Sequence, residues 1–535
     1  MDDGITGMTK KVKIFLAILL IASIAGMGYS FHDTAAIRKI AGTVQNIGRT
    51  SAAQQSTVDL TAPHYIIAGD GTYEYTITDR NLNLPEDIVI NGASDDTEYA
   101  SYLAALKTIF SAGNAPEQVD EDAETTIRES FSKYSMTAVF EYDVPLAEYL
   151  KFNNINSRTA EQLPGISRMT IFSDGSAALY NRHTGDYYRI AAASQEENAL
   201  QQNLEKLMQY VFENPGTDNR MQSITSMTGV ENSALIPEGA QITVGSTPFV
   251  SEFRSDQPED QERVKKVFFP DGMDFVNTIK KADGSTILMY GSGKDVLKFG
   301  NDGKVSNFAE LQTEEYRKCG LYESLKNAAA FLESENWKTE EMDQLNLFVK
   351  EVSQISERNC SGYRIEVGAS FHGMEVMYEN DSLLTMEIFG KQITSCIRNL
   401  PDLRGAAISA EPAGAMGGTD LIRQNSDTVA AVILDLCSDD SSVNTEKYSA
   451  NDNFYAVASS IIDARLTLVR LEDAATAAAN AGEQPDNGGG NPAGAAENAD
   501  NGGASLCIPA WYLLVDGVEF WFNAENGNLL SYGKK

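Results

Sequence analysis

The sequence has little of three things that protein chemistry often uses, namely cysteine, histidine and positive charge. It holds five cysteines and four histidines among 535 residues, and its 42 Lys and Arg are outnumbered by 76 Asp and Glu. The resulting net charge of −34 opposes contact with nucleic acid and with anionic lipid headgroups, because both repel an acidic surface. We therefore expect no nucleic-acid partner.

The cysteines are too widely spaced to form a short metal or redox motif. They lie at least 36 residues apart and include no C-x-x-C, which excludes zinc knuckles and thioredoxin-type motifs. We interpret them as small buried thiols, and a disulfide framework is the alternative. The five are Cys319, Cys360, Cys396, Cys437 and Cys507.

The histidines show no metal-binding spacing either. His32, His64, His183 and His372 are far apart, and no H-E-x-x-H occurs. His183 and His372 lie beside turn residues, so we interpret them as solvated. We expect no metal and no cofactor.

Two short stretches resemble catalytic or phosphate-binding motifs and then fail on detail. In the run Gly291–Lys294 a phosphate loop would need Gly at position 288 and Ser or Thr at 295, where the sequence has Leu and Asp. The run Gly368–His372 has Gly-x-Ser, but histidine replaces the second glycine, and strands flank it on both sides. We expect a hairpin turn at the first and no nucleophile at the second. The Ser130-x-x-Lys133 match is of a kind common by chance.

Acidic residues are so abundant that a nearby pair proves nothing. The cluster Glu117–Glu124 is most simply solvated loop charge, and weak calcium binding is an alternative without the required register. We expect no catalytic residues and no enzyme, and a hydrolase using paired carboxylates is a further hypothesis.

The N-terminus carries a membrane signal. An uncharged apolar run of 18 residues, 14–31, follows Lys10, Lys11 and Lys13. As a helix it would span about 27 Å, enough for a bilayer core. The positive-inside rule puts residues 1–13 in the cytoplasm and the rest outside. We predict a retained single-pass anchor in the cell membrane, with a signal peptide cleaved near Ser23-Ile24-Ala25 as the alternative.

Beyond the anchor we predict an α+β chain of about three domains, each an antiparallel sheet with helices. The expected parts are a stalk at 32–62, a first ectodomain at 63–240, a central β-meander domain at 241–315 and a C-terminal α+β domain at 316–535. The stretch 474–504 has no large apolar residue, so we predict a disordered insertion there.

Within the first ectodomain, apolar spacing predicts helices around 99–110 and 200–211, with a strand meander between them at 169–190. We interpret 213–240 as a connector. In the central domain, Asp283-Gly284 and Asn301-Asp302-Gly303 separate apolar runs, which predicts hairpins.

In the C-terminal domain, apolar spacing predicts helices at 321–332, 342–355 and 454–462. Strands are expected at 363–367, 374–378, 383–389, 393–397 and 466–471. The last 30 residues predict a hairpin that turns at Asp516-Gly517 and completes the sheet of this domain.

Three segments resemble the YycH/YycI proteins. The tail matches their closing hairpin, with a related closing motif in PepSY-like domains, through Pro509, Ala510, Trp511, Asn523, Ala524 and Gly527. The run 267–299 resembles the central YycH domain, and 362–393 resembles the third domain, which YycI shares. The length favours the YycH type.

The resemblance implies an extracytoplasmic regulator of the sensor kinase in the cell-wall two-component system of Gram-positive bacteria. The expected partners are that membrane histidine kinase, a paralogous regulator and, through one helix, membrane lipid. Small residues that would allow close helix packing are Ala17, Ala22, Ala25 and Gly26. The alternative function is a PepSY-like binding or inhibitor module that restrains an exported protease or hydrolase.

Overall fold

The computed structural model describes most of one compact unit, Val58–Lys535. The described ranges are 58–69, 74–77, 98–111, 115–119, 134–191, 219–232, 234–254, 257–269, 276–290, 293–312, 320–378, 381–438, 443–449, 452–471 and 505–535.

Several predictions concern residues outside these ranges. They are the anchor at 14–31, all but the last five residues of the stalk, the helix at 200–211 and the insertion at 474–504. Among the helices that are described, none is both long enough and apolar enough to cross a membrane.

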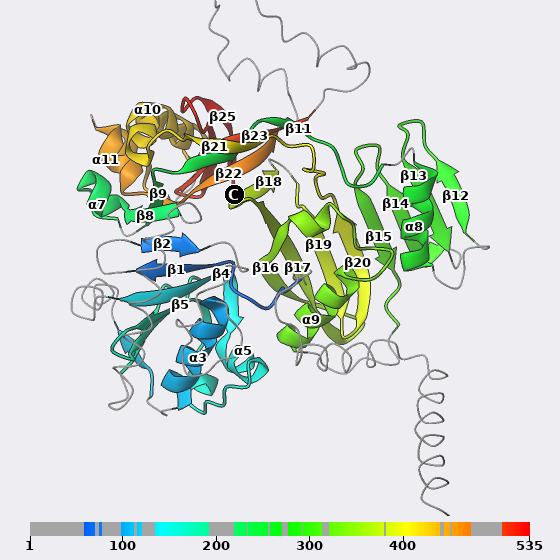
Figure 1. The fold of residues 1–535 in the computed structure, drawn as a ribbon, viewed down its shortest axis with the longest axis horizontal. Helices are drawn as coiled ribbons and strands as arrows, with labels where there is room; N and C mark the ends of the chain where they lie inside the picture. The colour runs from blue at the N-terminus through cyan, green and yellow to red at the C-terminus, as the bar shows by residue number, and fades with distance from the viewer. Residues whose placement is uncertain are drawn as a thin grey trace, which may run out of the picture. The chain divides into compact units, whose positions relative to one another are not determined.

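The first sheet is antiparallel throughout, in the order β3-β7-β6-β5-β4-β1-β2-β8-β9 (Figure 1). Three helices and a 3₁₀ turn accompany it, α3 (Glu98–Ser111), α5 (Leu146–Phe152), α7 (Ile224–Thr228) and η2 (Ala160–Gln162). The strands are β1 (Tyr65–Gly69), β2 (Glu74–Ile77), β3 (Glu117–Val119), β4 (Ser135–Pro145), β5 (Gly165–Phe172), β6 (Ala177–Tyr180), β7 (Tyr187–Ile190), β8 (Asn219–Ser223) and β9 (Leu235–Glu238).

The predicted helix at 99–110 and the meander at 169–190 are confirmed as α3 and as β5 to β7. In α3, Tyr102, Leu106, Ile109 and Phe110 are buried at the spacing of one helix face.

The predicted connector at 213–240 is wrong, because its residues include two strands and a short helix. β8 and β9 extend the sheet at its edge, and Ser223 caps α7 by accepting a hydrogen bond from the backbone N–H of Ser226 (3.1 Å). Strands of five and four residues hold few side chains, so they leave little hydrophobic alternation to read in the sequence.

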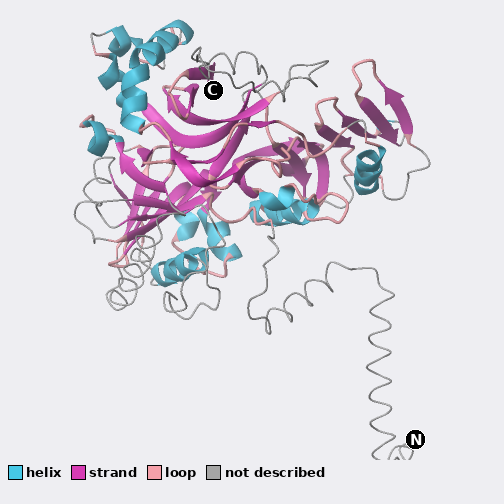
Figure 2. Cartoon of the chain, turned by 45° about the horizontal axis from the view of Figure 1, so that its top comes forward, coloured by secondary structure: helices cyan, strands magenta, loops and turns pink. Residues whose placement is uncertain are grey.

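The second large sheet runs from the central meander to the C-terminus, and strands predominate over helices in the described structure (Figure 2). Its main path is β12-β13-β14-β15-β20-β19-β17-β18-β22-β23-β24-β25, with β16 paired to β17 and β11 to β23. The strands are β11 (Thr247–Pro248), β12 (Asn277–Lys280), β13 (Thr286–Tyr290), β14 (Asp295–Phe299), β15 (Val305–Ala309), β16 (Asn346–Glu357), β17 (Cys360–Phe371), β18 (Met374–Tyr378), β19 (Leu384–Phe389), β20 (Gln392–Arg398), β22 (Ile461–Leu471), β23 (Leu506–Val515), β24 (Val518–Asn523) and β25 (Leu529–Lys534).

The other described elements flank this sheet. They are the two-stranded pair β10 (Gln241–Val244) and β21 (Ile408–Gly414), the helices α8 (Pro258–Phe268), α9 (Leu321–Leu332), α10 (Gly418–Leu436) and α11 (Asn453–Ala458), and the 3₁₀ turns η5 (Met342–Gln344) and η6 (Thr445–Ser449). The predicted helix at 321–332 is confirmed as α9.

The sheet crosses the predicted boundary at 315 without a break, because β15 of the meander pairs with β20 of the C-terminal part. This pairing does not divide the chain into the three predicted domains or join them, so their boundaries stay predictions. The α+β class with antiparallel sheets is confirmed, and β18 with β22 is the parallel pair among the described strands.

The predicted helix at 342–355 is wrong. Only Met342–Gln344 turns, as η5, and β16 follows along the whole of β17. Apolar residues three or four apart fit a helix, but Val349, Val352 and Ile355 are β-branched and favour a strand. A register shift between Val349 and Glu351 explains why their spacing does not alternate.

The predicted third helix is shorter than expected, because α11 ends at Ala458 and Ile462 already lies in β22. Helix α10 was not predicted, although Leu421, Ile422, Val429 and Ile433 line its buried face.

Candidate functional site

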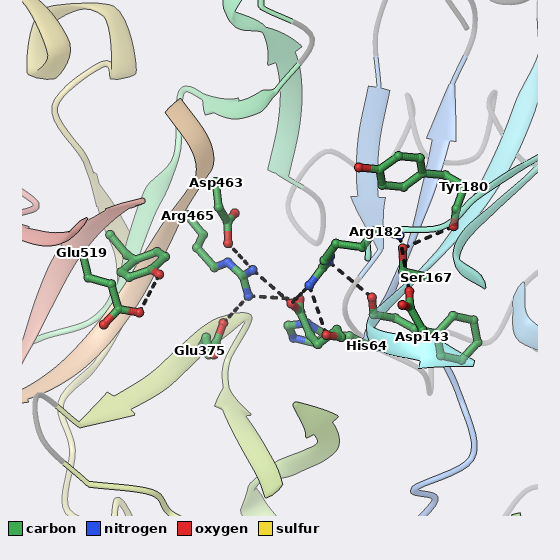
Figure 3. Close-up of polar contacts among 12 residues, drawn as sticks. His64, Asp143, Ser167, Tyr180, Arg182, Glu375, Asp463, Arg465 and Glu519 are labelled. Atoms are coloured by element: carbon green, nitrogen blue, oxygen red, sulfur yellow. Dashed lines mark hydrogen bonds and ion pairs between the residues drawn. The ribbon is translucent and has the colours of Figure 1, made fainter. Parts of the chain in front are cut away.

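A cluster of charged side chains lies where the first sheet meets the second (Figure 3). It contains Glu141 of β4, Glu375 of β18, and Asp463 and Arg465 of β22, with His64 just before β1. These residues are up to 401 positions apart in the sequence, so the fold alone brings them together.

The first sheet supplies Glu141 and His64 at an irregularity in its ladder. The pairing of β4 with β5 shifts register between Val139 and Val144, and Glu141 lies within that shift. The backbone N–H of His64 donates to the carbonyl of Val139 (2.8 Å), which fixes His64 beside the same strand. A register shift of this kind turns a side chain away from the regular face of the sheet.

The second sheet supplies the other three residues from two parallel strands. Glu375 lies opposite Thr467 in the pairing of β18 with β22. Asp463 and Arg465 are two residues apart in β22, so their side chains project from the same face.

Arg465 is the centre of the cluster. Its Nη1 donates to Oε2 of Glu375 (2.6 Å) and lies 3.2 Å from Oε1 of Glu141. Its Nη2 donates to Asp463 and lies 3.4 Å from Oε2 of Glu141. One guanidinium therefore joins three carboxylates, a geometry that the planar fork of arginine suits.

His64 and Arg182 complete the shell of Glu141. Nδ1 of His64 lies 2.9 Å from Oε1 of Glu141, and the ring stacks on Phe348 of β16 with centroids 3.5 Å apart. Nη1 of Arg182 donates to the backbone carbonyl of Glu141 (3.0 Å) and lies 3.4 Å from its Oε2. Arg182 is half exposed, whereas Glu141 and Glu375 are buried.

The pKa shifts follow from these contacts. Burial alone would raise the pKa of Glu141, but Arg465, the hydrogen bond with His64 and Arg182 outweigh it and hold this pKa well below its ordinary value. Burial would likewise lower the pKa of Arg465, but Asp463, Glu141 and Glu375 raise it. Both groups are therefore charged at neutral pH.

These contacts restrict Glu141 as an acid–base group. The hypothesis of a carboxylate-based hydrolase needs one carboxyl group that can take up or release a proton, and Glu141 is held ionised. No Ser, Thr or Cys side chain of the described residues hydrogen-bonds His64 to form a nucleophile pair. Among the residues that the structure describes, no group of three or more His, Cys, Asp and Glu side chains is arranged to hold a metal ion.

A second buried ion pair joins the central segment to the C-terminal strands. Arg398 at the end of β20 contacts Glu252 through Nε–Oε1 (2.6 Å) and Nη2–Oε2 (2.5 Å), and both side chains are fully buried. Thr339 donates to Oε2 of Glu252 (2.8 Å), and the guanidinium lies 4.6 Å from the ring of Trp337. This bidentate ion pair stabilises the packing of three chain segments, those around residues 252, 337–339 and 398.

The tail residues singled out in the sequence form the closing hairpin, as predicted. Pro509, Ala510 and Trp511 lie in β23, which pairs with both β22 and β24. The backbone N–H of Ala524 donates to the carbonyl of Pro509 (3.1 Å), and Oδ1 of Asn523 accepts from the N–H groups of Glu525 and Asn526.

Trp511 and Gly527 fasten this hairpin to α10. Nε1 of Trp511 donates to the carbonyl of Met416 (3.0 Å), and Asn425 donates to the carbonyl of Gly527 (2.9 Å). Gly527 has a φ of +72°, and a Cβ there would lie 2.6 Å from the sulfur of Met416. The closing motif is therefore a packing motif in this fold.

The fold is similar to that of YycH from Bacillus subtilis. Its crystal structure matches with a TM-score of 0.44 and 12% identity over 90% of this chain and 98% of that one. The Bacillus megaterium YpeB C-terminal domain matches with a TM-score of 0.24 and 9% identity over 54% and 99%.

No family model matches the sequence, and the search of curated proteins found no match. Similarity this remote does not determine what the chain binds.

The small residues expected to contact a partner helix, Ala17, Ala22, Ala25 and Gly26, lie outside the described residues. The predicted turn histidines are confirmed, since His183 and His372 are both exposed in turns. Cys360, Cys396, Cys437 and Cys507 are free thiols, and the last three are buried.

The charged cluster was not predicted. The one local sign of it is the Asp463-x-Arg465 spacing inside an apolar strand, which places two charges on a face expected to be buried. Its partners Glu141 and Glu375 carry no comparable signal.

Proposed function

We propose that the chain is a non-catalytic regulatory protein of the cell membrane, with its C-terminal bulk outside the cell. In this proposal residues 14–31 form the single anchor, and the regulated partner is the sensor histidine kinase of a two-component system. A paralogous regulator would be a further partner.

The arrangement of the motif segments carries the proposal. The three segments that resemble YycH/YycI regulators, 267–299, 362–393 and 509–527, each contribute strands to one continuous sheet. Segments that are far apart in the sequence but belong to one sheet, with β15 and β22 between them, support a shared architecture rather than three chance matches.

The charged cluster supports the non-catalytic part. Its arginine pairs with the buried carboxylates from within the chain, so the cluster joins two sheets and holds Glu141 in its ionised form. A body of this kind can still act on a kinase, by binding one of the kinase's conformations more tightly than the other.

The anchor gives the sharpest test. In the full-length protein, Ala22→Leu together with Gly26→Leu fills the small-xxx-small face of the expected helix. We expect the loss of about 1–2 kcal/mol of helix association, which is about a fivefold to thirtyfold drop in kinase co-purified from membranes.

The control is Gly28→Leu, which adds one leucine side chain on a different side of an ideal helix. Unchanged recovery of the kinase in the double variant, or an equal loss in the control, would refute the helix contact.

A PepSY-like inhibitor is the second candidate, because β23 to β25 form the closing hairpin on which that resemblance rests. Mass spectrometry after pull-down separates the two functions. The regulator requires the full-length chain to capture a kinase, whereas the inhibitor requires residues 58–535 alone to capture an exported protease or hydrolase.

A further inference from the structure

The central meander β12 to β15 has apolar side chains on both faces. The inner face carries Leu288, Leu297, Phe299 and Val305, all buried, and α8 packs on this side against β14 (Figure 1). The outer face shows a second apolar set. A sheet face that looks onto water is ordinarily polar, so this second set needs an explanation.

Cross-strand pairing defines the outer patch. One row runs Asn277–Met289–Val296–Phe308 and the next runs Ile279–Ile287–Lys298–Ser306. Phe308 is 50% exposed and Ile279 is 45% exposed, whereas Ile287, Met289 and Val296 are partly covered. No described helix or strand covers this patch.

The patch also differs from the rest of the protein in charge. Residues 277–310 contain five lysines and four acidic residues, a net charge of +1 in a chain of −34. Lys294 pairs with Glu310 (2.9 Å) and Lys304 with Asp381 (2.6 Å), but Lys298 is exposed and forms no ion pair with a described residue. The outer patch thus places an unpaired cation among apolar side chains.

We infer that the outer patch binds a partner protein through an apolar surface that carries a carboxylate opposite Lys298. Phe308 and Ile279 supply the apolar contact, and exclusion of water around Lys298 strengthens its pairing with the partner's carboxylate. This site is separate from the expected membrane helix and does not depend on which protein that helix contacts.

The net negative charge of the chain makes two other occupants of the outer patch unfavourable, namely a second copy of the chain and an anionic membrane. A second copy of the chain would bring two bodies of net charge −34 together and, across a twofold axis, would set Lys298 near its own counterpart. An anionic membrane would attract the one lysine but repel the acidic remainder of the chain.

Site-specific photo-crosslinking tests the inference in the full-length protein, expressed in the cells that make it. Benzoylphenylalanine replaces Phe308 or Ile279, and the matched control places it at Tyr455 in α11, which is 55% exposed. We expect both patch positions, and not the control, to crosslink a protein at a segment that contains apolar residues and Asp or Glu. Adducts only with a second copy, only with lipid, or none at all would overturn the inference.

A charge exchange then tests the role of Lys298. With the crosslinked partner purified, Lys298→Glu should weaken binding at least about tenfold, which is about 1.4 kcal/mol. Exchange of the mapped carboxylate for Lys in the partner should restore it.

Lys266→Glu, an exposed change in α8 on the other side of the meander, is the control and should leave binding unchanged. Equal weakening by both variants would mean long-range repulsion and would overturn the contact. The anchor double variant leaves these crosslinks in place, so failure here and failure of the helix contact are distinguishable.

Discussion

Arg465 neutralises more buried charge than any other described side chain of the cluster. It contacts Glu141, Glu375 and Asp463 at once, and its own side chain is only 21% exposed. Charge taken out of water is stable only when its partner is close and well oriented. Arg182 also approaches Glu141, but it is 51% exposed, and water screens the interaction.

Arg465→Met should therefore destabilise the protein strongly. Methionine keeps most of the side-chain length but leaves Glu141 and Glu375 buried without their main cation. We expect the free energy of unfolding to fall by about 3–5 kcal/mol, measured by urea denaturation of the purified protein.

Arg182→Met is the matched control and should cost less than about 1 kcal/mol. If the two variants unfold at the same urea concentration, Arg465 does not hold the two sheets together.

The hairpins show what local sequence can predict at the scale of elements. Asp283-Gly284 and Asp516-Gly517 were expected as turns, and both glycines have positive φ, which a residue without Cβ adopts at little cost. The turn residues and the alternating apolar runs between them determine these hairpins within about ten residues of sequence.

Secondary structure that depends on contacts with distant residues could not be predicted from the sequence in the same way. The apolar spacing of Val349, Val352 and Ile355 fits a helix or a strand, and pairing along β17 decides for the strand. The short strands β8 and β9 exist because a sheet edge is available to them. In each case the deciding contact lies with a residue outside the element.

Gly527 offers a test at this scale, because its αL backbone disfavours a side chain and a Cβ there would displace the sulfur of Met416. Gly527→Ala should cost about 1–3 kcal/mol through backbone strain and displacement of Met416. The closing hairpin would loosen from α10, which hydrogen exchange of β24 and β25 and a lower unfolding midpoint would both report.

Gly533→Ala is the matched control in β25, where a Cβ meets nothing within 4 Å and φ is not positive. It should leave the midpoint within the range of a neutral surface change, about 0.5 kcal/mol. Equal effects of the two variants would contradict the packing role given to Gly527.

At the scale of the whole molecule, the charged cluster depends on contacts that no local pattern encodes. Arg465 lies 324 residues from Glu141 and 90 from Glu375. The pairing of β18 with β22 brings Glu375 to Arg465, and the packing of the first sheet, with β4 against β16, adds Glu141. Sequence could predict the class of the fold and the closing hairpin, but the cluster required the assembled sheets.

The distribution of charge gives the last prediction. The chain carries −34, so its like charges repel in the folded state, and salt weakens that repulsion. Salt screens the buried ion pairs of Arg465 and Arg398 much less.

Raising NaCl from about 10 mM to about 500 mM shortens the Debye length from about 30 Å to about 4 Å. At neutral pH the thermal midpoint should then rise by about 2–4 °C, measured by calorimetry. At pH 4.5, near the isoelectric point of the sequence, net repulsion vanishes and the same salt should give no rise. A fall at neutral pH would mean that exposed ion pairs outweigh repulsion, and an equal rise at both pH values would mean that salt acts through the exclusion of ions from the surface rather than through charge.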